Sequence, residues 1–232
     1  MTTDAAPGET DPLWAPPSAP RRERRPLSRE AIVGAAVALA DAEGIEAVSM
    51  PRLARTLGAA PMSLYRHVPH KEALLALMVD AAVGPPPDVA AETVREGMAR
   101  WARANRGVFA AHPWTLPLVT GPQRMGPSEC AWAEVFLTLL DEVAGMPAEQ
   151  AIALVHVVNA YVRGASAPIG NRAPTAAEVR SAGREDELPR LLTLLPSDAD
   201  TRGAQGPDDE LFELGLAAVV DGCVRQAGID PS

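Results

Sequence analysis

The segment PMSLYRHVPHK, residues 61–71, carries side chains suited to the base edges and the phosphates of DNA. Ser63 can hydrogen-bond to a base edge, Met62 can contact a thymine methyl group, and Arg66 can reach a guanine or a phosphate. Three further donors are suited to phosphate oxygens: Tyr65, His67 and Lys71, the only lysine in the chain. The segment therefore predicts contact with duplex DNA.

Four predicted helices must position this segment, over residues 29–43, about 50–57, 61–67 and about 71–83. Ser28 and Ser49 are suited to cap the first two helices, because a serine hydroxyl accepts from the exposed backbone N–H groups. Gly58 can adopt the left-handed conformation of a tight turn, and Pro61 fits the first turn of a helix. Two short helices joined in this way predict a helix-turn-helix whose second helix enters the major groove.

Charge is distributed unevenly along the chain, whose formal net charge is -9. Residues 21–71 hold nine Arg and Lys against five Asp and Glu, a local charge of +4. Residues 85–232 hold 12 Arg against 20 Asp and Glu, a local charge of -8. An acidic chain can still bind a polyanion through one basic region, so the N-terminal part is the candidate for nucleic acid.

The stretch SMPRLARTLGAAPMSLYRHVPHKEALLALMVD, and LYRHVPHKEALL most specifically, resembles the DNA-binding domain of TetR-family transcriptional regulators. The resemblance covers about residues 28–83. It implies that the tyrosine, the histidine and the lysine hold the DNA backbone, and that the turn and the early recognition helix touch bases. The expected DNA-binding residues are Ser49, Arg52, Ala60, Pro61, Met62, Ser63, Tyr65, Arg66, His67 and Lys71.

Two prolines depart from the pattern of the tetracycline repressor, to which this helix-turn-helix is similar. Pro51 stands where that pattern has a base-reading arginine, and Pro61 where it has a base-reading glutamine. Proline offers no side-chain hydrogen bond, so we expect a different operator sequence.

Composition favours an all-α fold, because Ala, Leu and Val recur at helical spacing. We expect an N-terminal three-helix helix-turn-helix DNA-binding domain over residues 27–84 and a larger helical ligand-binding and dimerisation domain over residues 85–232. The triple proline at 85–87 marks the boundary. Residues 1–26 hold six of the 23 prolines and the run RRERRP, which indicates a disordered arm. Its arginines either contact DNA or are simply solvated.

In the C-terminal part, Ser128 is suited to cap a helix over residues 128–144, and Thr175 and Glu178 have the spacing of a capping box. Two apolar helices are predicted over about residues 147–165 and 208–226. Both are apolar on more than one face, which favours a homodimer over the alternative of ordinary core helices in a monomer. The resemblance implies that they pair with their twins in a four-helix bundle. A two-fold symmetric dimer requires a near-palindromic operator.

Five of the nine aromatic residues lie between residues 101 and 136, and several polar residues fall in the same helices. Such a mixture suits a cavity for a small organic effector, although the aromatic residues could equally fill a core. The candidate effector-binding residues are Trp101, Asn105, Phe109, His112, Trp114, Trp132, Phe136, His156, Asn159 and Arg163. We expect no metal and no cofactor, since no histidine occurs between His112 and His156 to match the tetracycline repressor's metal-binding histidine.

Other functional classes lack their sequence signals. We find no nucleophile elbow, Walker loop, HExxH or Rossmann glycine pattern, so we expect no enzyme. The alternative we retain is a non-sensing, dimeric architectural DNA-binding protein. No apolar run reaches the ~20 residues of a membrane-spanning helix, and no signal peptide is apparent, so we expect a cytoplasmic protein. Cys130 and Cys223 are expected to be buried, reduced thiols.

Overall fold

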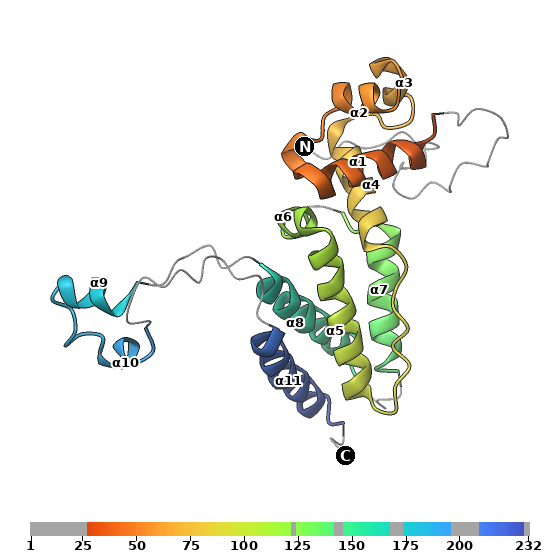
Figure 1. Cartoon of the computed structure of the whole chain (residues 1–232). Helices are drawn as coiled ribbons and strands as arrows, with labels where there is room; N and C mark the ends of the chain where they lie inside the picture. Colours follow the sequence, from red (N-terminus) through yellow and green to blue (C-terminus); the bar gives the residue numbers. More distant parts are fainter. Residues whose placement is uncertain (1–26, 122–123, 142–145, 168–173, 196–208, 230–232) are drawn as a thin grey trace. The chain divides into compact units, whose positions relative to one another are not determined.

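The computed structural model describes residues 27–121, 124–141, 146–167, 174–195 and 209–229, and these ranges fold into helices without a strand. This confirms the predicted all-α class. The expected arm at 1–26 lies outside the described residues. The helices (Figure 1) are α1 (Arg29–Glu43), η1 (Ile45–Ala47), α2 (Met50–Thr56), α3 (Pro61–Tyr65), α4 (Lys71–Val83), α5 (Val94–Ala111), η2 (Pro113–Thr115), α6 (Leu116–Val119), α7 (Pro127–Thr138), α8 (Ala148–Ser166), α9 (Ala176–Ser181), α10 (Pro189–Leu192) and α11 (Asp209–Gln226).

The chain divides into two compact units. The main unit contains the residues up to Ser166 and those from Leu216 onward, and the small unit is Ala167–Gly215. Within the small unit, Thr175 and Glu178 form the capping box that starts α9: the Glu178 backbone N–H donates to Thr175 Oγ1 over 3.1 Å, and the Thr175 N–H donates to Glu178 Oε2 over 2.7 Å. The sequence spacing predicted this box.

The first four helices share an apolar core inside the main unit. Ser28 caps α1 as predicted, its Oγ accepting from the Ala31 backbone N–H over 3.1 Å. Gly58 follows α2 with φ +61°, so the left-handed turn between α2 and α3 is also as predicted. Side chains from α1, α2, α4 and the α3 region meet in this core: Ile32, Ala36, Ala40, Leu53, Ala54, Leu64, Val68, Leu74 and Met78.

Helix α7 begins differently from the prediction, which placed its cap at Ser128. The N-cap is Gly126, and Pro127 occupies the first turn. Gly126 has no side chain to cap with, so Asp80 on α4 takes that part: its Oδ1 accepts from the Ser128 backbone N–H over 2.7 Å. The Trp132 indole N–H donates to the Gly84 carbonyl over 3.0 Å. Two hydrogen bonds therefore join the C-terminal part of α4 to α7.

The C-terminal core of the main unit is built on tryptophan. Trp101 on α5 meets Trp132 and Phe136 on α7 edge to face, with ring centroids 5.8 Å and 5.1 Å apart. The Trp101 indole N–H donates to the Trp132 carbonyl over 2.9 Å, so its polar atom is satisfied. This arrangement fixes the register of α5 against α7.

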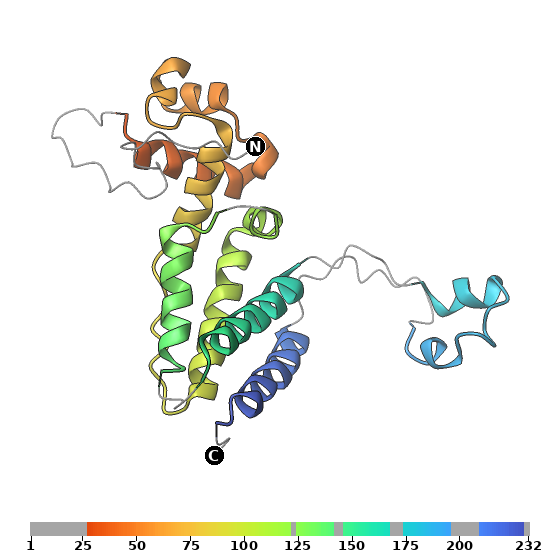
Figure 2. The same ribbon diagram turned by 180° about the vertical axis from the view of Figure 1, so that it is seen from behind.

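The part of α11 from Leu216 onward, which belongs to the main unit, lies beside α8 in both views of the ribbon (Figures 1 and 2). The Gln150 side chain donates to the Gln226 carbonyl over 2.8 Å, and Arg95 on α5 pairs with Asp221 on α11 over 2.7 Å. The predicted helices at 147–165 and 208–226 are thus confirmed to within a residue or two. Predicted helix 128–144 is shorter, since α7 ends at Thr138 and residues 142–145 lie outside the described ranges.

The two cysteines differ in their surroundings. Cys223 is buried, and burial raises the pKa of its thiol above the ordinary value. Cys130 is exposed, which corrects the prediction of a buried thiol. It stands two residues before Trp132, about 200° round the helix, so when Trp132 faces the core Cys130 faces outward. None of the described helices combines the length and apolar composition needed to cross a bilayer.

We expect the Gly126→Ala substitution to destabilise the protein by about 1 to 3 kcal/mol, because it overpacks the α4–α7 contact. A Cβ at Gly126 would lie 2.3 Å from Asp80 Oδ1. The matched control is Gly107→Ala on α5, where a Cβ meets nothing within 4 Å and the substitution should be neutral or stabilising. Urea unfolding followed by circular dichroism measures both. Equal stability of the two variants would contradict the described joint.

Candidate DNA-binding surface and effector cavity

The front of α3 is open to solvent, as a recognition helix requires. Met62 is 71% exposed, and Ala60 and Pro61 are exposed beside it, whereas Ser63 is half-buried. Leu64 faces the opposite way and is fully buried, so it holds α3 on the core. The four residues predicted to touch bases therefore lie together at the N-terminal end of α3.

The C-terminal end of α3 comes earlier than predicted. The helix stops at Tyr65, with Arg66 as its C-cap, and His67 lies in the following turn. Val68, the residue after His67, is fully buried and packs this turn against the core. Tyr65 is 42% exposed, so it is not the buried core aromatic that its neighbours could have suggested. Arg66 is exposed and His67 is half-buried.

Lys71 opens α4 and is exposed. The residue before it, His70, is the N-cap: its Nδ1 accepts from the Ala73 backbone N–H over 3.1 Å. Sequence analysis missed this cap, because histidine is not among the usual N-cap residues. The cap sets the start of α4 and hence the position of the lysine.

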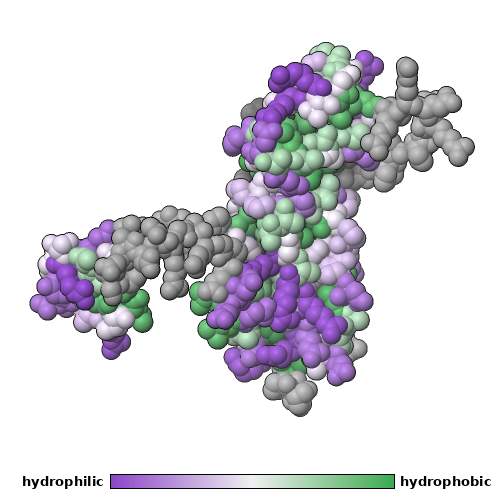
Figure 3. Space-filling view, in the orientation of Figure 1, coloured by the Kyte–Doolittle hydropathy of each residue, from purple (hydrophilic) through white to green (hydrophobic). Residues whose placement is uncertain are grey.

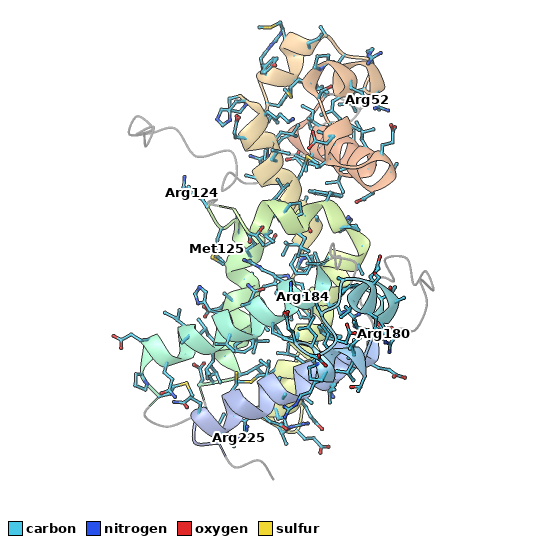
Figure 4. All side chains as sticks on the ribbon, turned by 90° about the vertical axis from the view of Figure 1, so that its left-hand side faces the viewer. Arg52, Arg124, Met125, Arg180, Arg184 and Arg225 are labelled. Carbon is cyan, nitrogen blue, oxygen red and sulfur yellow. The ribbon has the colours of Figure 1, made fainter. Side chains whose placement is uncertain are left out.

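Ser49 and Arg52 belong to the start of α2. Ser49 occupies the N-cap position and is exposed, but its side chain makes no capping hydrogen bond. Its hydroxyl is therefore not committed to the helix. Arg52, labelled in Figure 4, hydrogen-bonds to Glu43 at the end of α1. This ion pair ties α2 to α1 and holds Arg52 in place.

A cavity of about 420 Å³ lies in the C-terminal part of the main unit. Seven of the ten predicted effector residues line it: Trp101, Asn105, Phe109, Trp132, His156, Asn159 and Arg163. Among the lining residues that sequence analysis did not select are Val83, Met125, Glu129, Leu137 and Ile152. Met125, labelled in Figure 4, is half-exposed and so lies where the cavity meets solvent.

The polar groups of the cavity come mainly from α5, α7 and α8. The Asn105 amide donates to Asn159 Oδ1 over 3.3 Å, and Arg163 Nη1 donates to the Val119 carbonyl over 2.9 Å. Burial raises the pKa of Glu129 and lowers that of Arg163, and the charge of each partly offsets the effect on the other. Glu129 was not among the predicted residues, because its position depends on α7 beginning at Gly126 rather than at the expected cap, Ser128.

Three predicted effector residues lie elsewhere. Phe136 is fully buried against Trp101, one helical turn beyond Trp132, and fills the core between α5 and α7. His112 and Trp114 follow the C-terminal end of α5, so the chain has already left the cavity. Their assignment to the effector site is therefore corrected.

His112 and Trp114 instead hold a carboxylate on α1. The Trp114 indole N–H donates to Asp41 Oδ1 over 2.7 Å, and His112 Nδ1 lies 2.7 Å from the same oxygen. Asp41 carried no signal in the sequence, because its partners lie some seventy positions along the chain. The contact links the first helix to the end of α5.

Helices α8 and α11 expose large apolar side chains. Ile152 and Val157 on α8 are each 49% exposed, and Leu211 and Leu214 on α11 are more exposed still. Figure 3 shows hydrophobic side chains at the surface in the region of these two helices. Within the described ranges, no group of three or more His, Cys, Asp or Glu side chains could hold a metal ion.

Comparisons with known proteins agree over nearly the whole chain. The model of bacterial regulatory proteins of the tetR family matches residues 32–78, and that of the tetracyclin repressor-like C-terminal domain matches residues 86–226. The HTH-type transcriptional repressor DrrR1 of Streptomyces coeruleorubidus is 32% identical, covering 90% of this chain and 82% of the relative. An HTH-type transcriptional regulator of Saccharopolyspora erythraea is 29% identical, covering 99% and 97%.

Solved structures show the same fold. Apo ActR from Streptomyces coelicolor superposes with a TM-score of 0.71 and 26% identity, over 89% of this chain and 99% of that one. ActR in complex with actinorhodin gives 0.64 and 25%, over 88% and 99%. From its two family matches and these relatives, the chain belongs to the TetR family of bacterial transcriptional regulators.

Proposed function

We propose that this regulator is a homodimeric repressor that leaves its operator when a small organic effector fills the cavity between α5, α7 and α8. The observation that carries the proposal is one chain holding both an exposed recognition helix and an aromatic cavity with convergent polar groups. The proposed parts are the DNA-binding domain 27–84 and the effector and dimerisation domain 85–232. Because the proposed operator is bacterial DNA, we assign the protein to the cytoplasm.

For DNA contact, we assign base reading to the exposed front of α3 and backbone contact to the residues around it. The assignment rests on the exposure of Met62, Tyr65 and Lys71 beside a fully buried Leu64. Exposed donors at and beyond the C-terminal end of α3 match the way such helices are held on phosphates. Arg52 keeps a supporting place, since its ion pair with Glu43 orients α2.

For dimerisation, we assign the interface to α8 and α11. Val157 and Leu214 leave apolar surface in water that a twin molecule would cover. Isologous pairing across a two-fold axis buries the same surface on both copies. The dimer presents two α3 helices, and a near-palindromic operator provides two half-sites for them.

For effector binding, relatives support a sensing role over a purely architectural one. ActR has been solved with (S)-DNPA and with actinorhodin, both as complexes of that protein. In this chain the matching half contains a cavity of about 420 Å³, within the usual range for small-molecule sites. A regulator that used this half only to dimerise would have no need of such a cavity.

Two structural connections link the effector-binding part of the main unit to the DNA-binding helices. Helix α4 starts at Lys71, and its last residue, Val83, lines the cavity. The other connection is Asp41 on α1, which accepts from Trp114 and contacts His112 at the end of α5. An effector that shifts α5 or α7 favours a conformer in which the two α3 helices no longer fit the operator.

The Lys71→Ala variant should bind all DNA sequences more weakly and reduce the salt dependence of binding by about one phosphate contact. Anisotropy titrations at several salt concentrations, with a duplex selected in vitro by the purified protein and with a random duplex, measure this. Arg190→Ala on α10, where the arginine is exposed and lies outside the assigned surfaces, is the charge-matched control and should change neither quantity. An unchanged salt slope for Lys71→Ala would refute the assigned phosphate contact.

Met62→Ala and Ser63→Ala should change which operator is preferred. We expect each to cost about 1 to 3 kcal/mol on the selected duplex and little on random DNA, because a base contact acts only on the matching sequence. Repeating the in vitro selection with each variant reports the new preference. If both variants lose affinity equally on selected and random DNA, their side chains do not read bases.

Asp41→Ala should separate effector binding from operator release. The cavity is untouched, so a ligand identified by tryptophan quenching should bind within about twofold of wild type. Its effect on operator affinity, typically about 5- to 150-fold in such systems, should fall several-fold. Asp88→Ala removes a carboxylate whose one hydrogen bond among the described residues comes from the nearby Ala90 N–H, and should leave the coupling intact. Wild-type coupling in Asp41→Ala would exclude this route.

A further inference from the structure

Arg163 stands out among the groups that line the cavity, because it is charged and one of its buried donors has no acceptor. Its Nη1 donates to the Val119 carbonyl over 2.9 Å. Its Nε is buried and has no hydrogen-bond partner. A guanidinium carries five N–H donors, and leaving a buried one unmet is costly.

Glu129 lines the same cavity but does not fill this need. Its Oε2 accepts from the Gly126 backbone N–H over 3.1 Å at the start of α7. In the ranges that the structure describes, no ion pair joins Glu129 to Arg163, although each charge affects the other. The Arg163 guanidinium thus has no carboxylate partner among the described residues.

The walls of the cavity restrict the body of the ligand. Trp101, Phe109 and Trp132 supply aromatic surface, and the two tryptophan rings meet at 72°. Flat aromatic ligands gain most from such walls, through stacked or edge-to-face contacts. Asn105 and Asn159 share one hydrogen bond, and Arg163 is the cationic donor of the cavity.

The charge of Arg163 selects among aromatic ligands. A cationic ligand would meet like charge, and an uncharged hydrocarbon would leave the buried donor unmet. A carboxylate offers two oxygens and a negative charge to the guanidinium, which gives a charge-assisted contact.

We propose that the effector is an aromatic carboxylic acid, whose carboxylate binds Arg163 and whose rings lie against Trp101, Phe109 and Trp132. The inference rests on the proposed effector role of the cavity and specifies its ligand class. The charge of Glu129 acts on Arg163 and repels an anion, so it lowers the affinity for the carboxylate. The ligand therefore needs its aromatic contacts as well as its contact with Arg163.

The test is equilibrium dialysis of the full-length protein with two probes of the same shape, 2-anthracenecarboxylate and its neutral amide, 2-anthracenecarboxamide. Wild type should bind the acid at least about tenfold more tightly than the amide, as expected for one charge-assisted contact. Arg163→Gln should lower the affinity for the acid by about 10- to 100-fold and leave the affinity for the amide within about twofold. Retained amide binding shows that the cavity of this variant is intact.

Two further variants make the charge requirement specific. Arg163→Lys keeps the charge without the planar fork and should retain part of the preference for the acid. Glu129→Gln keeps an acceptor for the Gly126 N–H and removes the negative charge, so it should bind the acid more tightly and the amide as before. If Arg163→Gln fails to fold, the wild-type comparison and these two variants still decide.

Three results would overturn the proposal: no saturable binding of the acid, equal binding of acid and amide by wild type, or an undiminished preference for the acid in Arg163→Gln. Operator release is measured separately with the same acid. Specific binding of the acid without any change in operator affinity would contradict the proposed repressor switch and leave the ligand class standing.

Discussion

The contact between Asp80 and the first turn of α7 is the constraint on which the architecture depends. Asp80 belongs to α4, whose other end positions Lys71, and its carboxylate caps the helix that contributes Glu129 and Trp132 to the cavity. Gly126 is present because any Cβ there would collide with that carboxylate. A second bond, from Trp132 to the Gly84 carbonyl, fixes the same joint at one further point. One helix therefore belongs to both the DNA-binding surface and the cavity wall.

The cavity places polar groups where they stabilise a ligand better than they stabilise the fold. A half-buried guanidinium whose buried Nε has no acceptor and a carboxylate with a raised pKa both cost folding free energy. Such groups are expected at sites where a ligand completes the missing contacts. The core beside the cavity shows the contrast: Trp101 has its indole N–H satisfied by the Trp132 carbonyl and makes no demand on a ligand.

Features set by neighbouring residues could be predicted from the sequence. The Ser28 cap, the left-handed Gly58 turn and the Thr175–Glu178 box each depend on residues within four positions. Seven cavity residues were also predicted, because the apolar stripes of α5, α7 and α8 show which faces point inward. The DNA-facing residues of α3 stay a prediction that exposure supports.

Features that depend on distant partners could not be predicted in this way. Asp41 and Asp80 look like ordinary surface carboxylates until the fold brings their partners to them. His112 and Trp114 were assigned to the cavity because they follow its helix, yet α5 ends first. Cys130 was expected to be a buried thiol because it lies far from Cys223 and has no Cys or His at metal-ligand spacing, but its side of α7 faces solvent.

In the proposed switch, effector binding in the cavity and operator binding oppose each other, because helix α4 is part of both sites. Thermodynamic linkage provides the most direct measurement. The affinity of one bound ligand is measured with and without saturating operator DNA, and the affinity of the operator is measured with and without saturating ligand. The affinity for the ligand and the affinity for the operator should both fall, and by the same factor. A factor of one in both directions would show two independent sites and contradict the proposed switch.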